Sequence, residues 1–189
     1  MANILTIAVK PASETNEDQA RLSIDGKDWL GPEFAGLDPP MLEAELLGKR
    51  IGTLLVGRCW CGMIGCQDVK VEVTRTERCV RWTRPGEHVA RFNPAQYDAE
   101  VARFAGDRSW ESVERAAARE IEHIFRGTTI KGGFEFSGVS TRTRRGFVHL
   151  SFRKGYAHKL LKFRWDGASV SGAIERAKLF RAERFPHCG

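Results

Sequence analysis

The chain has 189 residues, of which 42% are hydrophobic and 29% are charged. This is ordinary globular composition, which excludes a collagen-like or disordered chain, and the apolar runs are too short to cross a bilayer. The chain contains five cysteines, an odd number, and shows no signal-peptide pattern at its start. We therefore expect reduced thiols in a cytoplasmic protein.

Charge is unevenly distributed along the sequence. Residues 1–125 contain 16 Lys and Arg against 20 Asp and Glu, a net charge of −4, whereas residues 126–189 contain 14 against 4, a net charge of +10. A basic surface attracts nucleic acid, anionic lipid or an acidic protein. Docking on the chain's own acidic part is the remaining alternative.

The N-terminal part is predicted to alternate short strands with turns. Residues 4–9 alternate loosely between apolar and polar and suit a strand. Asp25-Gly26 is a hairpin signal between two short apolar runs. A connector rich in Gly and Pro follows at residues 31–40. Asp38 is then expected to cap a short helix that opens with Pro39 and stops before Gly48.

Residues 52–84 are predicted to form a three-stranded antiparallel meander. The first strand places Leu54, Val56 and Trp60 on one face. The next two strands repeat an apolar residue at every second position, and a further short strand is expected at residues 89–92. The repeated positions are Val69, Val71, Val73, Val80 and Trp82.

Two helices are predicted between residues 93 and 127. Asn93 caps the first helix, which ends near Gly106. Ser109 caps the second, which ends before Gly127 and carries an apolar stripe at a period close to 3.6 residues. The stripe comprises Trp110, Val113, Ala117, Ile121 and Ile124.

The basic end of the chain is predicted to form three strands and a helix at residues 169–183. The strands have apolar residues at every second position, around Phe136, Leu150 and Phe163. The fold class is therefore α+β, with antiparallel sheet, a central helical pair and a C-terminal helix, in a single domain of residues 1–189. Within it we distinguish a β-rich part (1–92), a helical part (93–127) and a basic βββα part (128–189).

Residues 59–66 place three thiols within eight positions, separated by two glycines. If Cys61 and Cys66 flank a four-residue hairpin loop, they face each other, and Cys59 points to the same face as Cys61. Asp68 then falls opposite Cys59. Since Zn²⁺ takes four ligands in a tetrahedron, the segment supplies three thiolates and a candidate fourth ligand. Cys79 lies roughly 20 Å away along the next strand and is not expected to join them.

Three interpretations of this thiol segment stay open. The first is a structural role without metal, in which small thiols and glycines form a tight turn, so that no cofactor is needed. The second is a zinc site formed by Cys59, Cys61 and Cys66. The third is a redox pair of Cys61 and Cys66.

The C-x-C-G-x-x-G-C pattern, followed by alternating valines and a V-x-W strand, resembles a set of uncharacterised bacterial proteins. The resemblance covers residues 57–82 and the helical stretch after them. It implies a bacterial cytosolic protein and supplies no catalytic residues. Small α+β proteins of this general kind include immunity and accessory partners, which is an analogy of fold alone.

Basic and aromatic residues are interleaved between residues 142 and 165. The run from Arg145 to Phe152 is similar to the RNP1 strand of RNA-recognition motifs, but a strand follows where that fold requires a helix. A basic, aromatic face of this kind suits single-stranded nucleic acid through phosphate charge and base stacking, and it suits an acidic protein equally. The candidate binding residues are Arg142, Arg144, Arg145, Phe147, His149, Lys162 and Arg164.

Catalytic patterns are missing from the sequence. It contains no G-x-G-x-x-G, Walker A or G-x-S-x-G motif, which favours a non-catalytic protein. The expected function is a bacterial cytoplasmic interaction protein, immunity- or accessory-like, that binds a partner protein through a charged sheet face. The alternatives are a nucleic-acid-binding protein that uses the basic C-terminal strands, and a small zinc protein.

Overall fold

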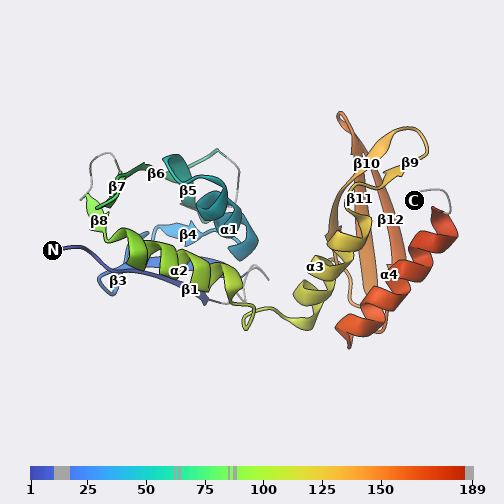
Figure 1. The fold of residues 1–189 in the computed structure, drawn as a ribbon. Helices are drawn as coiled ribbons and strands as arrows, with labels where there is room; N and C mark the ends of the chain where they lie inside the picture. Colours follow the sequence, from blue (N-terminus) through green and yellow to red (C-terminus); the bar gives the residue numbers. More distant parts are fainter. Residues whose placement is uncertain (11–17, 62, 64, 85, 87–88, 186–189) are drawn as a thin grey trace. The chain divides into compact units, whose positions relative to one another are not determined.

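The computed structural model describes residues 1–10, 18–61, 63, 65–84, 86 and 89–185. Its helices and antiparallel sheets confirm the predicted α+β class and the C-terminal helix. The chain divides into two compact units, unit 1 (residues 1–108) and unit 2 (residues 109–189), and Figure 1 labels most of their elements. The two helices predicted at residues 93–127 are both present, but one belongs to each unit.

The described residues of unit 1 form two antiparallel sheets and two helices. One sheet has the strand order β1-β2-β3, with bounds Leu5–Lys10, Gln19–Ile24 and Lys27–Asp28. The other has the order β4-β5-β6-β7-β8, with bounds Phe34–Gly36, Gly52–Cys59, Asp68–Arg75, Val80–Thr83 and Ala90–Phe92. The helices are α1 (Pro39–Gly48) and α2 (Pro94–Gly106). The hairpin predicted at Asp25-Gly26 joins β2 to β3, and both residues have the positive φ that a type I′ turn requires (52° and 75°).

A single hydrophobic core is shared by both sheets and both helices of unit 1. The valines of β6 are buried at alternate positions, as their period of two predicts. Trp82 of β7 is fully buried, and its ring centroid lies 5.8, 5.5 and 5.9 Å from those of Trp29, Phe92 and Tyr97. These edge-to-face contacts connect β7 to β8 and to the start of α2.

A β-bulge in β5 changes which residues reach the core. The pairing of β5 with β6 shifts register between Leu55 and Gly57. One additional residue reverses the alternation of faces along a strand. Cys59 is consequently buried at 9% exposure, whereas Trp60, just after the strand, is 55% exposed. The prediction that Trp60 shares a face with Leu54 and Val56 is therefore wrong.

Side chains of α2 cover the backbone of the edge strand β1. Gln96 donates to the Leu5 carbonyl over 3.0 Å, and the Ile7 N–H donates to the Glu100 carboxylate over 2.6 Å. Arg103 pairs with Glu100 at 2.7 Å and also donates to the Ile7 carbonyl. The unpaired side of β1 is thus capped by α2, which protects an edge that is otherwise open to pairing with another chain.

Glu100→Gln is expected to lower the free energy of unfolding of unit 1 at pH 7 by about 1–2 kcal/mol, because it removes the charge from two hydrogen-bonded contacts. Burial alone raises the pKa of Glu100, but the hydrogen bonds from Arg103 and the Ile7 N–H outweigh it and hold this pKa below its ordinary value. A depressed carboxyl pKa stabilises the fold above the unfolded-state pKa, about 4.3. The stabilisation is lost as the pH falls through the lower folded-state pKa.

Denaturant unfolding of wild type and Glu100→Gln between neutral and acid pH measures this effect. The two proteins should differ at pH 7 and converge in acid, while Glu77→Gln, an exposed carboxyl in the β6–β7 turn, should match wild type throughout. A constant difference at every pH would show that the contribution of Glu100 does not depend on its charge.

Between residues 109 and 185, unit 2 has the chain order helix, four strands, helix. Its helices are α3 (Val113–Phe125) and α4 (Val170–Arg184). Its strands are β9 (Thr129–Ile130), β10 (Phe134–Ser140), β11 (Phe147–Lys154) and β12 (Ala157–Arg164), which form one antiparallel sheet in the order β12-β11-β10-β9. Among the described residues, no helix combines the length and hydropathy that a bilayer-spanning segment needs.

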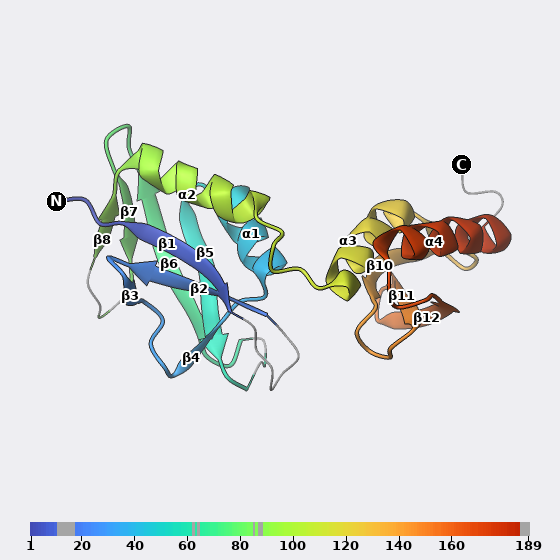
Figure 2. The same cartoon turned by 90° about the horizontal axis from the view of Figure 1, so that it is seen from below.

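Both helices of unit 2 pack on the same face of its sheet (Figure 2). The core between them is formed by alternate residues of β11 and β12 and by the inward sides of α3 and α4. Its fully buried members include Ala117, Ile121, Phe125, Val148, Leu150, Phe152, Ala173 and Ala177. The opposite face of the sheet has no helix of unit 2 over it in the part of the chain that is described.

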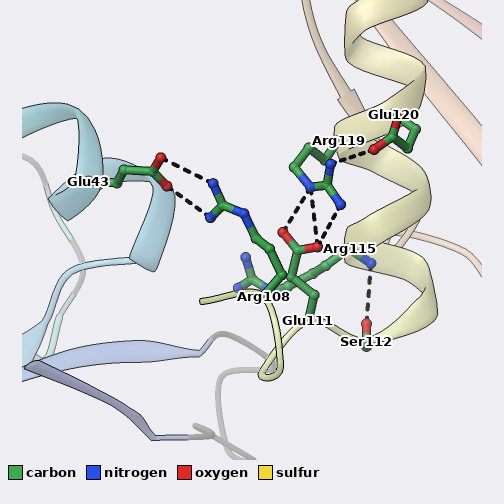
Figure 3. Close-up of polar contacts among 7 residues, drawn as sticks. All are labelled: Glu43, Arg108, Glu111, Ser112, Arg115, Arg119 and Glu120. Atoms are coloured by element: carbon green, nitrogen blue, oxygen red, sulfur yellow. Dashed lines mark hydrogen bonds and ion pairs between the residues drawn. The ribbon is translucent and has the colours of Figure 1, made fainter. Parts of the chain in front are cut away.

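The start of α3 differs from the prediction. Its N-cap is Ser112 rather than Ser109, because the Ser112 hydroxyl accepts from the Arg115 N–H over 3.2 Å (Figure 3). Glu111 lies before the helix and pairs with Arg119 at 3.0 Å. Within unit 1, the Arg108 guanidinium donates to both oxygens of the Glu43 carboxylate, over 2.9 and 3.1 Å (Figure 3).

Candidate binding sites: a basic sheet face and a thiol cluster

Five of the seven predicted binding residues meet on the open face of the unit 2 sheet, and the other two, Arg142 and Arg145, are exposed in the adjoining β10–β11 loop. Phe147 and His149 alternate with the buried residues of β11, and across the ladder they stand opposite Arg164 and Lys162 of β12. The loop from β10 to β11 carries three exposed arginines. We call the seven residues the basic sheet face: Arg142, Arg144, Arg145, Phe147, His149, Lys162 and Arg164.

The ring of Phe147 is the centre of this face. The guanidinium carbons of Arg144 and Arg164 lie 4.6 and 5.3 Å from the ring centroid, and the Lys162 Nζ lies 5.8 Å from it. The His149 ring is the next along the strand, with centroids 6.4 Å apart and planes inclined by 30°. Each cation–π contact at an exposed site contributes about 0.5–1 kcal/mol. The half-buried ring is therefore held in place with positive charge around it.

The positive charge of this region is not neutralised by carboxylates of the same sheet. Residues 134–164 contain eight Lys and Arg and one acidic residue, Glu135. In the described part of the chain, Arg144, Lys162 and Arg164 form no ion pair. Because β11 and β12 alternate, Lys162 and Arg164 project from the face opposite to the helices. The face consequently keeps a local field that attracts anions.

The similarity to RNP1 holds for the aromatic positions of the strand but not for the order of strands and helices around it. Phe147 and His149 occupy the third and fifth positions of that pattern, which are aromatic positions in RNA-recognition motifs, and both face outward here. The strand β12 follows β11 directly, as predicted, whereas a βαββαβ order is required for that fold. Unit 2 is therefore not an RNA-recognition motif, although it presents rings at equivalent strand positions.

The three thiols of the loop between β5 and β6 form a compact group. The sulfur atoms of Cys59, Cys61 and Cys66 all lie within 4.8 Å of one another, and those of Cys59 and Cys61 are 2.7 Å apart. This distance exceeds the roughly 2.05 Å of a disulfide bond, and all three thiols are free. The Cys59 N–H donates to the Gln67 carbonyl over 3.0 Å, which joins the two ends of the connection, and the Cys66 N–H donates to the Met63 carbonyl over 3.2 Å within it.

The proximity of the thiols shifts the pKa values of Cys59 and Cys66 in opposite directions. A hydrogen bond from the Cys61 thiol lowers the pKa of Cys59 below its ordinary value. The pKa of Cys66 is raised to about 11, chiefly because its hydrogen bond with Cys61 favours the protonated form. The lowered pKa of Cys59 favours its thiolate, which is the form of cysteine that reacts and binds metals.

The predicted role of Asp68 beside the thiols is wrong. Asp68 pairs with Arg58, not with Cys59, because the bulge in β5 turns Cys59 toward the core while Asp68 stays on the alternate face. The strands also stop at Cys59 and Asp68, so that Cys61 and Cys66 lie in the connecting segment and not at facing strand positions. The predicted turn glycine at position 62 lies outside the described residues.

Other candidate donors do not join the group. Cys79 is not a member of it, as predicted. His88, His187 and Cys188 lie outside the described residues, and His158 is exposed on β12 in unit 2. The described set therefore consists of the three thiols.

Sequence reasoning missed a cavity of about 410 Å³ in unit 1, lined by residues of α1 and α2. Arg75 donates to both oxygens of Asp98 at its wall, over 2.7 and 2.5 Å. This pairing holds the pKa of Asp98 below its ordinary value. The two charges satisfy each other, so the cavity offers no unpartnered group that selects a ligand. The two residues are too far apart in sequence for any local pattern to reveal them.

Comparisons with known proteins give no information about the function. No family model, curated protein or solved structure matches the chain.

Proposed function

We propose that unit 2 binds single-stranded nucleic acid on the basic sheet face. The observation that carries the proposal is the outward ring of Phe147 with three cationic groups within 5.8 Å of its centroid. Proteins that bind single strands without strong sequence preference combine a positively charged track with rings on which bases stack.

The arrangement of charges suits a polyanion. Outward positions on one strand repeat at about 6.6 Å, so Lys162 and Arg164 form a short row beside the rings of His149 and Phe147. The exposed Arg144 and Arg145 extend this row into the adjoining loop. Phosphates of an extended strand can contact this row while a base reaches the ring, and Arg provides forked donors that match phosphate oxygens.

The same geometry is less suited to an acidic protein partner. The core of a protein–protein interface is depleted in charge and in Lys, and its apolar centre is surrounded by a polar rim. Here the centre itself is surrounded by Arg and Lys. Of the exposed apolar residues of the sheet, Tyr156 lies in the β11–β12 turn and Leu160 lies within β12, two positions before Lys162, whereas Phe147 lies at the end of β11 away from that turn.

Titration of the full chain with labelled, unstructured RNA and DNA oligonucleotides tests the proposal, with duplex DNA and polyglutamate as competitors. We expect the single strands to bind and to be displaced poorly by both competitors. Binding of polyglutamate without binding of any oligonucleotide would contradict the proposal and indicate an acidic protein partner.

Phe147→Leu is expected to weaken oligonucleotide binding by roughly 5- to 150-fold, since stacking of one base on an aromatic ring contributes about 1–3 kcal/mol. Leucine keeps apolar bulk beside the cations but offers no π-face. Fluorescence anisotropy of the labelled oligonucleotide measures the change.

The matched control is Tyr156→Leu, which removes a fully exposed ring outside the basic sheet face. Its affinity should equal that of wild type. Equal losses in the two variants, or no loss in Phe147→Leu, would exclude a stacking role for Phe147.

A further inference from the structure

The distances within the thiol cluster fit one tetrahedral ion. Zn²⁺ binds thiolate sulfur at about 2.3 Å, so two sulfurs on one tetrahedral ion lie about 3.8 Å apart. The sulfur pairs of Cys59, Cys61 and Cys66 range from 2.7 Å to at most 4.8 Å and so bracket this value. Small rotations of the side chains bring all three to one ion.

Packing does not account for the cluster. Cys59 is buried, but Cys61 and Cys66 are exposed, so their sulfurs add little to the hydrophobic core. A small-residue role in the turn explains a glycine such as Gly65, whose φ is +80°, but not two exposed thiols that meet a third. The convergence of three sulfurs at the edge of a sheet is explained by a shared ligand.

The local backbone holds the donors from two directions. Cys59 is the last residue of β5 and pairs with Phe34 of β4, and its N–H donates to the carbonyl of Gln67, the residue before β6. Cys66 is held by the turn hydrogen bond to Met63. Two of the three ligands are therefore positioned before any ion binds, which lowers the entropy lost on binding.

We propose that Cys59, Cys61 and Cys66 bind one Zn²⁺ through three thiolates, with a water molecule in a fourth position that faces solvent. Each thiol that binds releases its proton to solvent. Soft thiolate donors favour zinc over the hard divalent ions magnesium and calcium. Because Cys61 and Cys66 are exposed, the ion is reachable from outside, and three protein ligands with an open position are typical of zinc sites that exchange a ligand rather than of closed structural sites.

The test uses the full chain, purified under reducing conditions and loaded with Zn²⁺ alone. We expect about one zinc per chain after gel filtration, measured by elemental analysis. Cys61→Ser and Cys66→Ser should each lower the zinc affinity by at least ~100-fold in competition with a chromophoric chelator, since loss of even an outer partner of a ligand costs 10–100-fold.

Cys79→Ser is the matched control because Cys79 lies outside the cluster, and its zinc affinity should equal that of wild type. Because Cys61 and Cys66 are exposed, serine at either position should leave the fold intact, which circular dichroism checks, so both variants remain informative if Cys59→Ser does not fold. Zinc-free wild type after loading, or equal affinities of all the serine variants, would overturn the proposal. A wild-type mass two hydrogens lighter under these reducing conditions would overturn it in favour of a disulfide.

Cobalt substitution tests the open fourth position. Three thiolates around tetrahedral Co²⁺ give strong ligand-field bands and a thiolate-to-metal charge-transfer band. A small monothiol added to the cobalt protein should increase the charge-transfer absorption because a fourth thiolate replaces water. An unchanged spectrum would show that the fourth position is already filled by a protein ligand.

Discussion

Reversal of two charges on the basic sheet face, in Arg145→Glu/Lys162→Glu, is expected to weaken binding of a single-stranded oligonucleotide by about 100-fold or more at about 0.1 M salt. Each substitution removes a cation that phosphate attracts and places a carboxylate there that repels it. Both side chains are exposed, so the change leaves the core of unit 2 intact. The loss should be larger than that caused by Phe147→Leu, since two phosphate contacts are replaced by two repulsions.

The control for this prediction is Lys178→Glu/Arg184→Glu. It changes the net charge by the same amount, at two exposed positions of α4, and α4 packs on the opposite face of the sheet. We expect its affinity to fall by only a few-fold through the long-range field. Equal losses in the two double variants would show that binding depends on total charge and not on the basic sheet face.

Gly36→Ala is expected to lower the free energy of unfolding of unit 1 by about 3 kcal/mol or more, because there is no space for a methyl group at this position. A Cβ atom there would lie 2.2 Å from the carbonyl oxygen of Ala20. That atom belongs to the backbone of β2, so no side-chain rotation relieves the contact. The strands must separate, which breaks the hydrogen bond from the Ala20 N–H to the Leu37 carbonyl, 2.8 Å long.

Gly48→Ala provides the comparison for this second prediction. Gly48 is the last residue of α1, and a Cβ atom there meets nothing within 4 Å. Alanine at such a site is neutral or stabilises by up to about 1 kcal/mol through the unfolded state. Native-state hydrogen exchange of the Val71 and Val73 amides reports the stability of unit 1 in both variants. Equal exchange in Gly36→Ala and wild type would contradict the close approach of β4 and β2.

Local patterns were sufficient for much of the fold. The period of two in residues 147–152 predicted a strand with Phe147 and His149 on its outer face, and both face outward. Asn93 caps α2 through the Ala95 and Gln96 N–H groups, as expected from the Asn-Pro pair. These features depend on residues within a few positions of each other, which is the range over which propensity and periodicity act.

Features that depend on distant pairing were missed. The bulge in β5 is set by its ladder with β6 and not by any residue of β5 alone, so the faces of Cys59, Trp60 and Asp68 could not be assigned from the sequence. The strand β4 has three residues in a connector rich in Gly and Pro, and it exists because β5 pairs with it.

In the candidate sites too, features set by nearby residues were predicted and features set by distant strand pairing were not. The cation–π cluster around Phe147 was foreseeable, because its members lie on two adjacent strands with clear alternation. The thiol cluster was expected from spacing alone, and the sulfurs of Cys59, Cys61 and Cys66 do lie close together. The predicted fourth ligand, Asp68, was wrong because the bulge in β5 places Cys59 on the other face of the strand.

The most direct measurement of the central claim is the salt dependence of oligonucleotide binding. For single strands, the slope of log affinity against log salt is about −0.7 per neutralised phosphate. If Arg144, Arg145, Lys162 and Arg164 all contact phosphates, the wild-type slope should be near −2.8, and that of Arg145→Glu/Lys162→Glu should be shallower by about 1.4. A wild-type slope near zero, or the same slope in both proteins, would contradict nucleic-acid binding on the basic sheet face.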